Sequence, residues 1–284
     1  MSATLIKGKP IAERIRAEVA EEVKAIGHIG LVTVLVGDDP ASEVYIRLKH
    51  KAALEAGFDA RDVRLPAETS EDDLLAKVAA LNADDEIDAI LVQLPMPDHI
   101  DEERVLRSIT PAKDVDGLHP FNAGQLFLGK PTLVGATPVG VMEMLREHDI
   151  EIKGARAVVI GRSNIVGKPM AHLLLQAHAT VTICHSRTRD LAWHTLNADI
   201  LVAAVGVPGM VSADMVKPGG VVIDVGINRT DAGLVGDVDP GGAEIAAFMT
   251  PVPGGVGPMT IACLLQNAVL CARYQRGETL YPPA

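Results

Sequence analysis

The sequence predicts an α/β protein with two domains, each built on a mainly parallel sheet. Patterns typical of helices and of strands alternate along the 284 residues, which indicates repeated β-α-β units. The strand-type runs are short and almost entirely apolar, as in strands buried on both faces. A stretch rich in proline and glycine, residues 111–140, separates two alternating series and is the best candidate for a domain junction.

The first series begins with an amphipathic helix that has Pro10 in its first turn and Gly27 just past its end. Its apolar residues recur every three or four positions, so one face of this helix is expected to be buried. The predicted elements are, in chain order, helix 9–27, strand 31–37, helix 42–57, strand 62–65, a helix opened by Ser70 and strand 88–95.

The second series has the rhythm of a doubly wound nucleotide-binding domain. A Gly/Pro-rich loop and a last apolar helix follow it, and the tail 277–284 is expected to be loose. The predicted elements are strand 155–161, a helix after residue 169, strand 179–184, a helix around Trp193, strands 199–206 and 219–226, loop 250–260 and helix 261–275.

Composition excludes several classes of protein. The formal net charge of -11 argues against nucleic acid or an anionic membrane as the main partner, because both require a basic surface. The N-terminus does not resemble a signal peptide, and no apolar run is expected to span a bilayer, so we expect a cytoplasmic protein. Cys184, Cys263 and Cys271 are expected to be buried reduced thiols, and no cluster has the spacing of a metal site.

A candidate phosphate-binding turn lies at residues 158–169, where a strand, a tight turn and a helix start follow one another. The pattern departs from G-x-G-x-x-G: Gly161 is present, Ser163 and Val166 replace the other two glycines, and Gly167 comes one residue late. An ordinary strand-to-helix turn explains this stretch about as well.

The next strand bears on the choice of cofactor. NAD-specific sites place an acidic residue at its end, whereas this strand ends in Ser186, Arg187 and Arg189, with Arg162 in the first turn. A hydroxyl and guanidinium groups suit the additional phosphate of NADP. Arg187 and Arg189 could equally be solvated loop residues.

Polar residues also mark a candidate substrate site in the first series. Gln93 is expected at the carboxyl end of a buried strand, where α/β sheets bind ligands. Asp114 and Asp116 lie in a predicted turn, for which turn chemistry alone is a sufficient explanation. Tyr45 and Lys49 lie one helical turn apart on one face, and a helical lysine is usually a solvated surface group.

Six stretches in the same order resemble the methylenetetrahydrofolate dehydrogenase/cyclohydrolase family, over essentially the whole chain. They are "VGDDPASEVYIRLKHKA" (36–52), "QLPMP" (93–97), "KDVDG" (113–117), "GRSNIVGKP" (161–169), "DVGINR" (224–229) and "TPVPGGVGPMT" (250–260).

The resemblance implies a fold of two domains around a deep cleft. It implies an N-terminal α/β domain at 1–138, with helix 262–284 packing back on it, and a Rossmann-like NADP domain at 139–261. It also implies a homodimer formed through the NADP domain.

The family's chemistry supplies expected roles. Hydride passes from methylenetetrahydrofolate to NADP, and water then opens methenyltetrahydrofolate to 10-formyltetrahydrofolate. By this resemblance Lys49 handles the proton in water addition, Tyr45 orients the folate ring, Gln93 hydrogen-bonds Lys49 and Asp116 binds the pterin. Burial would lower the lysine pKa toward the useful range.

The resemblance also implies two binding sets. The expected NADP set is Gly161, Arg162, Ser163, Ser186, Ile227, Thr137 and Thr260, and His185 is a further candidate. The expected folate set is Tyr45, Lys49, Val92, Gln93, Leu94, Asp116, Pro253, Gly257, Pro258 and Ile261. A Gly/Pro loop without a ligand role is the alternative for 250–260.

The chain departs from the family at Gly135 and Ala136, where many members carry Pro-Cys. This leaves the local loop shape open. Two other functions remain as alternatives: a different NADP-dependent dehydrogenase with two domains, and an NADP-binding module without catalysis. Neither accounts for the combination of Tyr45, Lys49, Gln93 and Asp116.

Overall fold

The computed structural model describes residues 2–38, 40–231 and 233–282; within helix α2 the side chains of residues 40–42, 44 and 45 are not described. Contacts divide the chain into two compact units. The three-stranded unit comprises Arg14–Gly135 and Leu264–Ala284, and the six-stranded unit comprises Met1–Glu13 and Ala136–Cys263.

The three-stranded unit is a parallel sheet in the order β3-β2-β4. Strand β2 is buried along its whole length, as its continuous apolar sequence predicts. The elements are α1 (Gly8–Ile26, shared with the other unit), β2 (Gly30–Val36), α2 (Pro40–Glu55), β3 (Asp59–Leu65), α3 (Glu71–Ala83), β4 (Ala89–Val92), α4 (Glu102–Ser108), the 3-10 helix η1 (Pro111–Lys113) and α5 (Pro120–Phe127).

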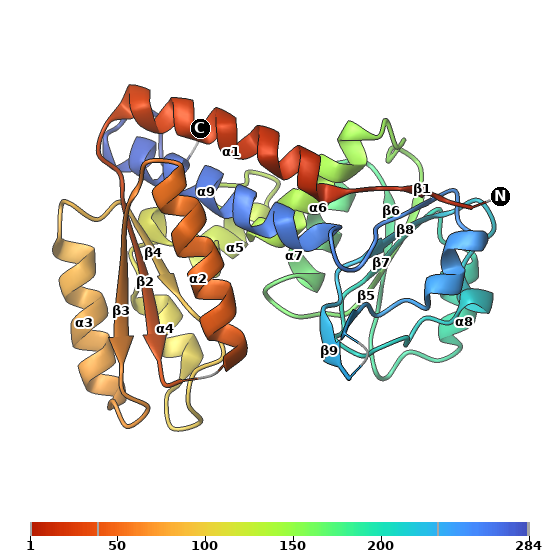
Figure 1. Cartoon of the computed structure of the whole chain (residues 1–284), viewed down its shortest axis with the longest axis horizontal. Coiled ribbons are helices and arrows are strands. Elements are labelled where there is room, and N and C mark those ends of the chain that lie inside the picture. The colour runs from red at the N-terminus through yellow and green to blue at the C-terminus, as the bar shows by residue number, and fades with distance from the viewer. Residues whose placement is uncertain (1, 39, 232, 283–284) are drawn as a thin grey trace. The chain divides into compact units, whose positions relative to one another are not determined.

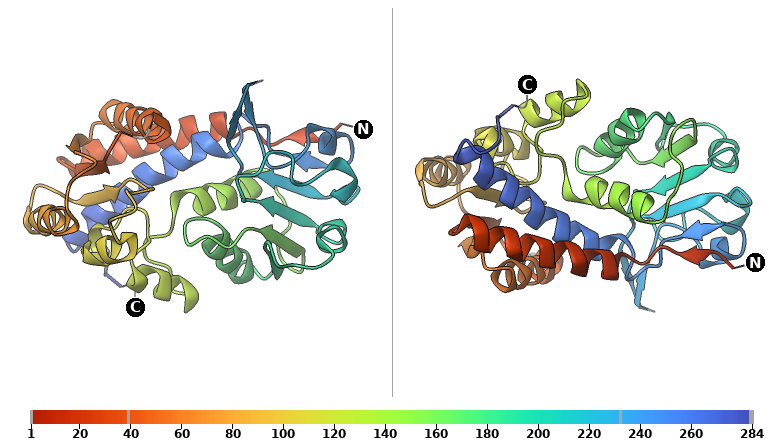
Figure 2. Two further views of the ribbon diagram at one scale, coloured as in Figure 1. Left: turned by 90° about the horizontal axis from the view of Figure 1, so that it is seen from below. Right: turned by 90° about the horizontal axis from the view of Figure 1, so that it is seen from above.

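Helices cover both faces of this sheet. Val32, Val34 and Val36 of β2 pack with Leu74 and Val78 of α3, and Val105 of α4 belongs to the same core. Figures 1 and 2 show α2 on the opposite face. The Ser70 hydroxyl accepts a hydrogen bond from the Asp73 backbone N–H at 3.1 Å, so the predicted start of α3 is confirmed.

The six-stranded unit has a parallel sheet in the order β1-β11-β8-β7-β5-β6, which confirms the doubly wound pattern (Figure 1). Helix α7 packs against β5 and β6, and α6 packs against α7. The elements are β1 (Thr4–Leu5), α6 (Ala136–Glu147), β5 (Arg156–Ile160), α7 (Gly167–Gln176), β6 (Thr180–Cys184), α8 (Leu191–Leu196), β7 (Ile200–Ala203), η2 (Ala213–Met215), β8 (Val221–Asp224), β9 (Asn228–Thr230), β10 (Gly233–Val235), η3 (Pro240–Glu244), β11 (Phe248–Met249) and α9 (Val256–Gln275, shared).

The stretch 111–140 holds more regular structure than its composition suggested. It contains α5, which begins at Pro120 with the His119 ring nitrogen accepting the Phe121 N–H, and the first turn of α6. Helix α9 begins at Val256, five residues before the predicted start, so Gly257 and Pro258 lie in its first turn. Proline in a first turn lacks only an N–H that has no helical partner.

The expectation of a loose tail is wrong for Tyr281. Its hydroxyl donates to Asn122 Oδ1 at 2.7 Å, and its ring centroid lies 4.7 Å from that of Tyr274. Asn122 is fully buried, so the tail supplies a partner to a buried polar group.

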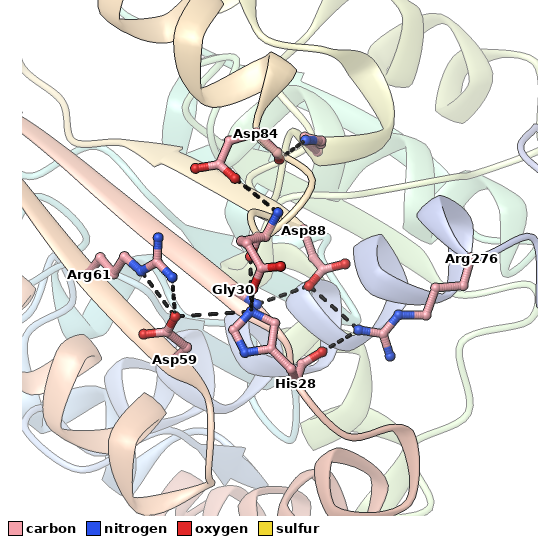
Figure 3. A network of polar contacts seen from close by, with 9 residues as sticks. His28, Gly30, Asp59, Arg61, Asp84, Asp88 and Arg276 are labelled. Atoms are coloured by element: carbon pink, nitrogen blue, oxygen red, sulfur yellow. Dashed lines mark hydrogen bonds and ion pairs between the residues drawn. The ribbon is translucent and has the colours of Figure 1, made fainter.

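A polar network also joins the end of α9 to the start of the sheet (Figure 3). Arg276 donates to the carbonyl oxygen of His28 and lies 3.8 Å from the buried carboxylate of Asp88. It also donates to the carbonyl oxygen of Ile26. Asp88 in turn accepts the Gly30 N–H at 2.9 Å. The C-terminal segment is therefore part of the three-stranded unit, although it is last in the sequence.

Among the described helices, α9 alone is long and apolar enough to cross a membrane by length and composition. Within the protein 61% of the apolar 18-residue segment of α9 is buried, as in the core helix of a globular fold. The three cysteines are buried, as expected.

Candidate active site

Lys49 lies on α2 and points to the end of β4. Its Nζ donates a hydrogen bond to Gln93 Oε1 at 3.2 Å. The Gln93 backbone N–H donates to the Val34 carbonyl at 2.9 Å and its side-chain amide donates to the Leu94 carbonyl at 2.7 Å. Gln93 thus has a fixed orientation at the carboxyl end of the sheet and presents an acceptor to the lysine.

The loop that carries Asp114 and Asp116 runs beside β4. Asp114 forms a β-bridge with Ile90, and its buried carboxylate accepts the His119 N–H at 2.7 Å and the Asn122 amide at 2.9 Å. Gly117 closes the turn with φ +65°, and a Cβ there would lie 2.5 Å from the Leu133 carbonyl oxygen. The two acids therefore differ. Asp114 holds the loop through its hydrogen bonds, whereas the carboxylate of Asp116 interacts with the charge of Lys49.

The charges of Lys49 and Asp116 are both destabilised by their surroundings. Burial lowers the pKa of Lys49, and the nearby carboxylate of Asp116 opposes this shift. Burial raises the pKa of Asp116, and Lys49 opposes that shift in turn. A lysine with a lowered pKa can release and accept a proton nearer neutral pH than an exposed lysine can.

The other expected folate residues of this unit differ in access. Val92 is 3% exposed, and its side chain belongs to the core of the unit. Leu94 is half-buried and precedes a cis peptide bond. The Tyr45 side chain lies outside the described part of the chain.

In the six-stranded unit, Gly161 forms the turn between β5 and α7. Its φ is +119°, and a Cβ there would lie 2.3 Å from the Ala204 carbonyl oxygen. A Cβ at Gly167, the first residue of α7, would likewise lie 2.3 Å from the Gly161 carbonyl oxygen. Two glycines thus let the turn close tightly before a helix N-terminus, where backbone N–H groups favour an anion.

The expected phosphate-contacting residues lie around this turn and at the end of β6. The Ser163 hydroxyl accepts the Val166 N–H at 3.1 Å, so it orders the turn that the missing glycine would have formed. Arg162 and Ser186 are exposed, as are Arg187 and Arg189. The Gly161 N–H donates to the Cys184 carbonyl at 2.9 Å, which ties the turn to the end of β6.

Two further pairs of expected residues are in contact. The hydroxyl oxygens of Thr137 on α6 and Thr260 on α9 lie 2.8 Å apart. A Cβ at Gly257 would lie 3.4 Å from the Ile227 Cδ1, so the side chain of Ile227 packs beside the first turn of α9. Of the other residues expected from loop 250–260, Pro253 is exposed and follows a cis bond, and Pro258 and Ile261 are half-buried.

Sequence reasoning missed two buried carboxylates, Asp224 at the end of β8 and Asp237 after β10. They are 2% and 0% exposed and accept hydrogen bonds from backbone N–H groups. The sequence signal was an aspartate two residues before Gly226 and another directly after Gly236, since a carboxylate packed against backbone needs a neighbour without a side chain.

The titration of Asp224 gives a test by pH. Burial raises its pKa to about 6 and Asp237 adds to this, while the N–H groups of Asp237, Val238 and Gly226 act against it. A raised pKa means that the folded protein binds the proton more tightly than the unfolded chain. This stabilisation is complete below the unfolded pKa of about 4 and is lost as the pH rises through 6.

From pH 7 to pH 5, the wild type should therefore gain about 1 kcal/mol of stability relative to Asp224→Asn. Urea unfolding followed by the fluorescence of Trp193, the single tryptophan, measures this difference. Asp199→Asn is the control of opposite sign, because the Lys217 ammonium lowers the pKa of Asp199. Equal pH profiles for wild type and Asp224→Asn would contradict the raised pKa.

Within residues 2–38, 40–231 and 233–282, no group of three or more His, Cys, Asp or Glu side chains is placed to hold a metal ion.

Comparisons with known proteins identify the family of both parts of the chain. Residues 6–116 match the model of the tetrahydrofolate dehydrogenase/cyclohydrolase catalytic domain, and residues 135–276 match the model of the NAD(P)-binding domain of the same family. The chain is 58% identical over 275 residues to the bifunctional protein FolD of Burkholderia multivorans, covering 95% of this chain and 96% of that protein.

Solved structures give the same result. The crystal structure of the bifunctional FolD methylenetetrahydrofolate dehydrogenase/cyclohydrolase of Campylobacter jejuni is 45% identical, with a TM-score of 0.94 and coverage of 96% of this chain and 99% of that one. The Trypanosoma brucei enzyme, complexed with NADP and an inhibitor, is 40% identical, with a TM-score of 0.92 and coverage of 99% and 100%. The chain belongs to the tetrahydrofolate dehydrogenase/cyclohydrolase family.

Proposed function

We infer that this chain is a bifunctional enzyme of one-carbon folate metabolism. It transfers a hydride from 5,10-methylenetetrahydrofolate to NADP, and it hydrolyses the resulting 5,10-methenyltetrahydrofolate to 10-formyltetrahydrofolate. The observation that carries both activities is the hydrogen-bonded pair of Lys49 and Gln93 beside Asp116, in a chain that also has the NAD(P)-binding domain.

Lys49 is the proposed proton-handling group of the hydrolysis. Water that attacks the methenyl carbon must lose a proton, and the lowered pKa of Lys49 suits it to accept one. Gln93 fixes the amine without the stabilising charge that a carboxylate would add. Asp116 is proposed to accept hydrogen bonds from the pterin, and Tyr45 to orient the ring.

The dehydrogenase step requires positioning of folate and cofactor rather than an acid or a base. NADP supplies the hydride acceptor when bound. The fit of a dinucleotide rests on the Gly161 turn, where Gly161 and Gly167 let the backbone close tightly just before the N-terminus of α7, a position that favours phosphate. Arg162, Ser163 and Ser186 are proposed to hold its phosphates, and Thr137, Thr260 and Ile227 its nicotinamide half.

The folate set is likewise a proposal: Val92 and Leu94 beside Gln93, and Pro253, Gly257, Pro258 and Ile261 from the start of α9. The functional domains are proposed to follow 1–138 with 262–284, and 139–261.

A cytoplasmic homodimer is the proposed form of the enzyme. Strand β6 is an edge of the six-stranded sheet, and Ile183 on it and Leu175 on α7 are 42% and 57% exposed. An exposed apolar edge favours pairing with a second copy. The molar mass from light scattering tests this proposal.

The decisive experiment is to mix the protein with methylenetetrahydrofolate and NADP. NADPH should form, and methenyltetrahydrofolate should appear by its near-ultraviolet absorbance and then decay enzymatically. NADPH without faster decay would remove the hydrolase activity from the proposal. No NADPH with either nicotinamide cofactor would favour a non-catalytic module.

A further inference from the structure

Asp224 and Asp237 form a reciprocal pair in the six-stranded unit. Each is buried, and each lies against a glycine one or two residues from its partner: a Cβ at Gly226 would lie 2.2 Å from Asp237 Oδ1, and one at Gly236 would lie 1.8 Å from Asp224 Oδ2. Two buried carboxylates are costly unless hydrogen bonds compensate them. Both carboxylates are compensated by hydrogen bonds from backbone N–H groups.

Asp237 holds the segment that follows β7. Its carboxylate accepts the N–H groups of Val205, Gly206 and Val207 at 2.7, 3.0 and 2.9 Å. It also accepts the side-chain amide of Asn228 at 3.0 Å. One side chain thus fixes three successive residues after β7 and one residue after β8.

Asp224 holds the partner segment. Its Oδ1 accepts the N–H groups of Gly226 and Asp237 at 3.0 and 2.9 Å, and its Oδ2 accepts that of Val238 at 2.9 Å. Ile227 consequently lies between Gly226, held by Asp224, and Asn228, held by Asp237. We call Asp224 and Asp237, with the backbone N–H groups they accept, the carboxylate clamp. The side chain of Ile227 remains 41% exposed, so the clamp holds the backbone on either side of Ile227 and leaves its side chain accessible.

The held segments border the topological switch point of the sheet. The chain passes from β5 to β6 on one side and then to β7 on the other side of β5, and doubly wound sheets bind ligands where the order reverses in this way. Ala204, directly before the held residues, places its carbonyl oxygen 2.3 Å from where a Gly161 Cβ would lie. The clamp therefore sets the wall opposite the Gly161 turn.

We propose that Asp237, supported by Asp224, is a positioning residue for NADP: it holds residues 205–207 and the backbone of Ile227 in the geometry that the bound nicotinamide half requires. This role rests on the proposed function, because it presumes NADP at the switch point. Asp237 contacts only protein atoms in this role and takes no part in the hydride transfer.

Asp237→Asn is the test. The variant keeps the size of the side chain but replaces one acceptor oxygen with a donor that faces backbone N–H groups, so at least part of the clamp is lost. The KM for NADP and its dissociation constant, measured by titration, should both rise about tenfold or more. Hydrolysis of methenyltetrahydrofolate without NADP should stay within about twofold of the wild type.

Asp199→Asn is the matched control. Asp199 lies at the amino-terminal ends of the strands of the same sheet, opposite the proposed cofactor site. There it accepts the Arg156 N–H at 2.8 Å and pairs with Lys217. Its loss should lower the stability of the same unit and leave the affinity for NADP unchanged. Asn228→Ala removes only one donor to Asp237 and provides a milder variant should Asp237→Asn fail to fold.

An unchanged NADP affinity in Asp237→Asn, or in Asn228→Ala if only that variant folds, would overturn the proposal. A loss of NADP affinity in Asp199→Asn equal to that in Asp237→Asn would also overturn it, because the effect would then be general destabilisation. Failure of the wild type to bind NADP would instead refute the proposed function, and the positioning role with it.

Discussion

Lys49→Met should abolish the hydrolysis of methenyltetrahydrofolate while NADP-dependent oxidation of methylenetetrahydrofolate continues. Methionine has a similar length and fills the space of the half-buried lysine, but it neither donates a hydrogen bond to Gln93 Oε1 nor carries a proton. Loss of a general acid or base typically costs about 10²–10⁴-fold in rate. In this variant methenyltetrahydrofolate should accumulate as NADPH forms, which its near-ultraviolet absorbance measures.

Lys51→Met is the matched control for this variant. Lys51 lies two residues further along α2, has a 73% exposed side chain and pairs with Glu55 at 3.7 Å. It should keep both activities. Wild-type hydrolysis in Lys49→Met would show that the proton-handling role is wrong, and equal losses in the two variants would indicate damage to α2 instead.

Gly161→Ala should eliminate NADP-dependent oxidation. The added methyl group would require φ +119° of a residue with a Cβ, and that Cβ would lie 2.3 Å from the Ala204 carbonyl oxygen. Since the obstacle is the backbone of Ala204, directly after the buried strand β7, the turn must move away from its place before α7. We expect a loss of roughly 100-fold or more in kcat/KM for NADP, with hydrolysis of methenyltetrahydrofolate retained.

Gly154→Ala is the control variant, because it introduces the backbone strain of a positive φ without a steric clash. Gly154 also has a positive φ, of +79°, but a Cβ there would have no atom within 4 Å. This variant should lose about 1 kcal/mol of stability and keep its affinity for NADP. An active Gly161→Ala enzyme with normal NADP binding would refute the role given to the turn.

The local patterns predicted most elements because the forces that form them act over a few residues. Continuous apolar runs predicted β2, β5, β7 and β8, and Ser70 predicted the start of α3. Elements of two or three residues, such as β1, β9 and β11, are too short to show a period. Helix α5 was missed because proline and glycine within residues 111–140 hide the period of its eight residues.

The candidate site divides in the same way. Gln93 and Gly161 could be predicted because each follows a buried strand, and the carboxyl end of a parallel strand is where α/β sheets bind ligands. The roles of Asp114 and Asp116 could not be separated by sequence spacing. The hydrogen bonds of Asp114 to His119 and Asn122, and the charge of Lys49 beside Asp116, separate them in space.

The two α/β series, the glycine turn before α7 and the family of the chain could be predicted from local periodicity and short ordered stretches. Three contacts became known only from the folded chain: Tyr281 donates a hydrogen bond to Asn122, Arg276 lies near Asp88, and Asp237 accepts the N–H groups of residues 205–207. Each of these contacts joins residues far apart in the chain. A carboxylate or an amide requires such a hydrogen-bond partner when it is buried, and it becomes buried only once the chain has folded.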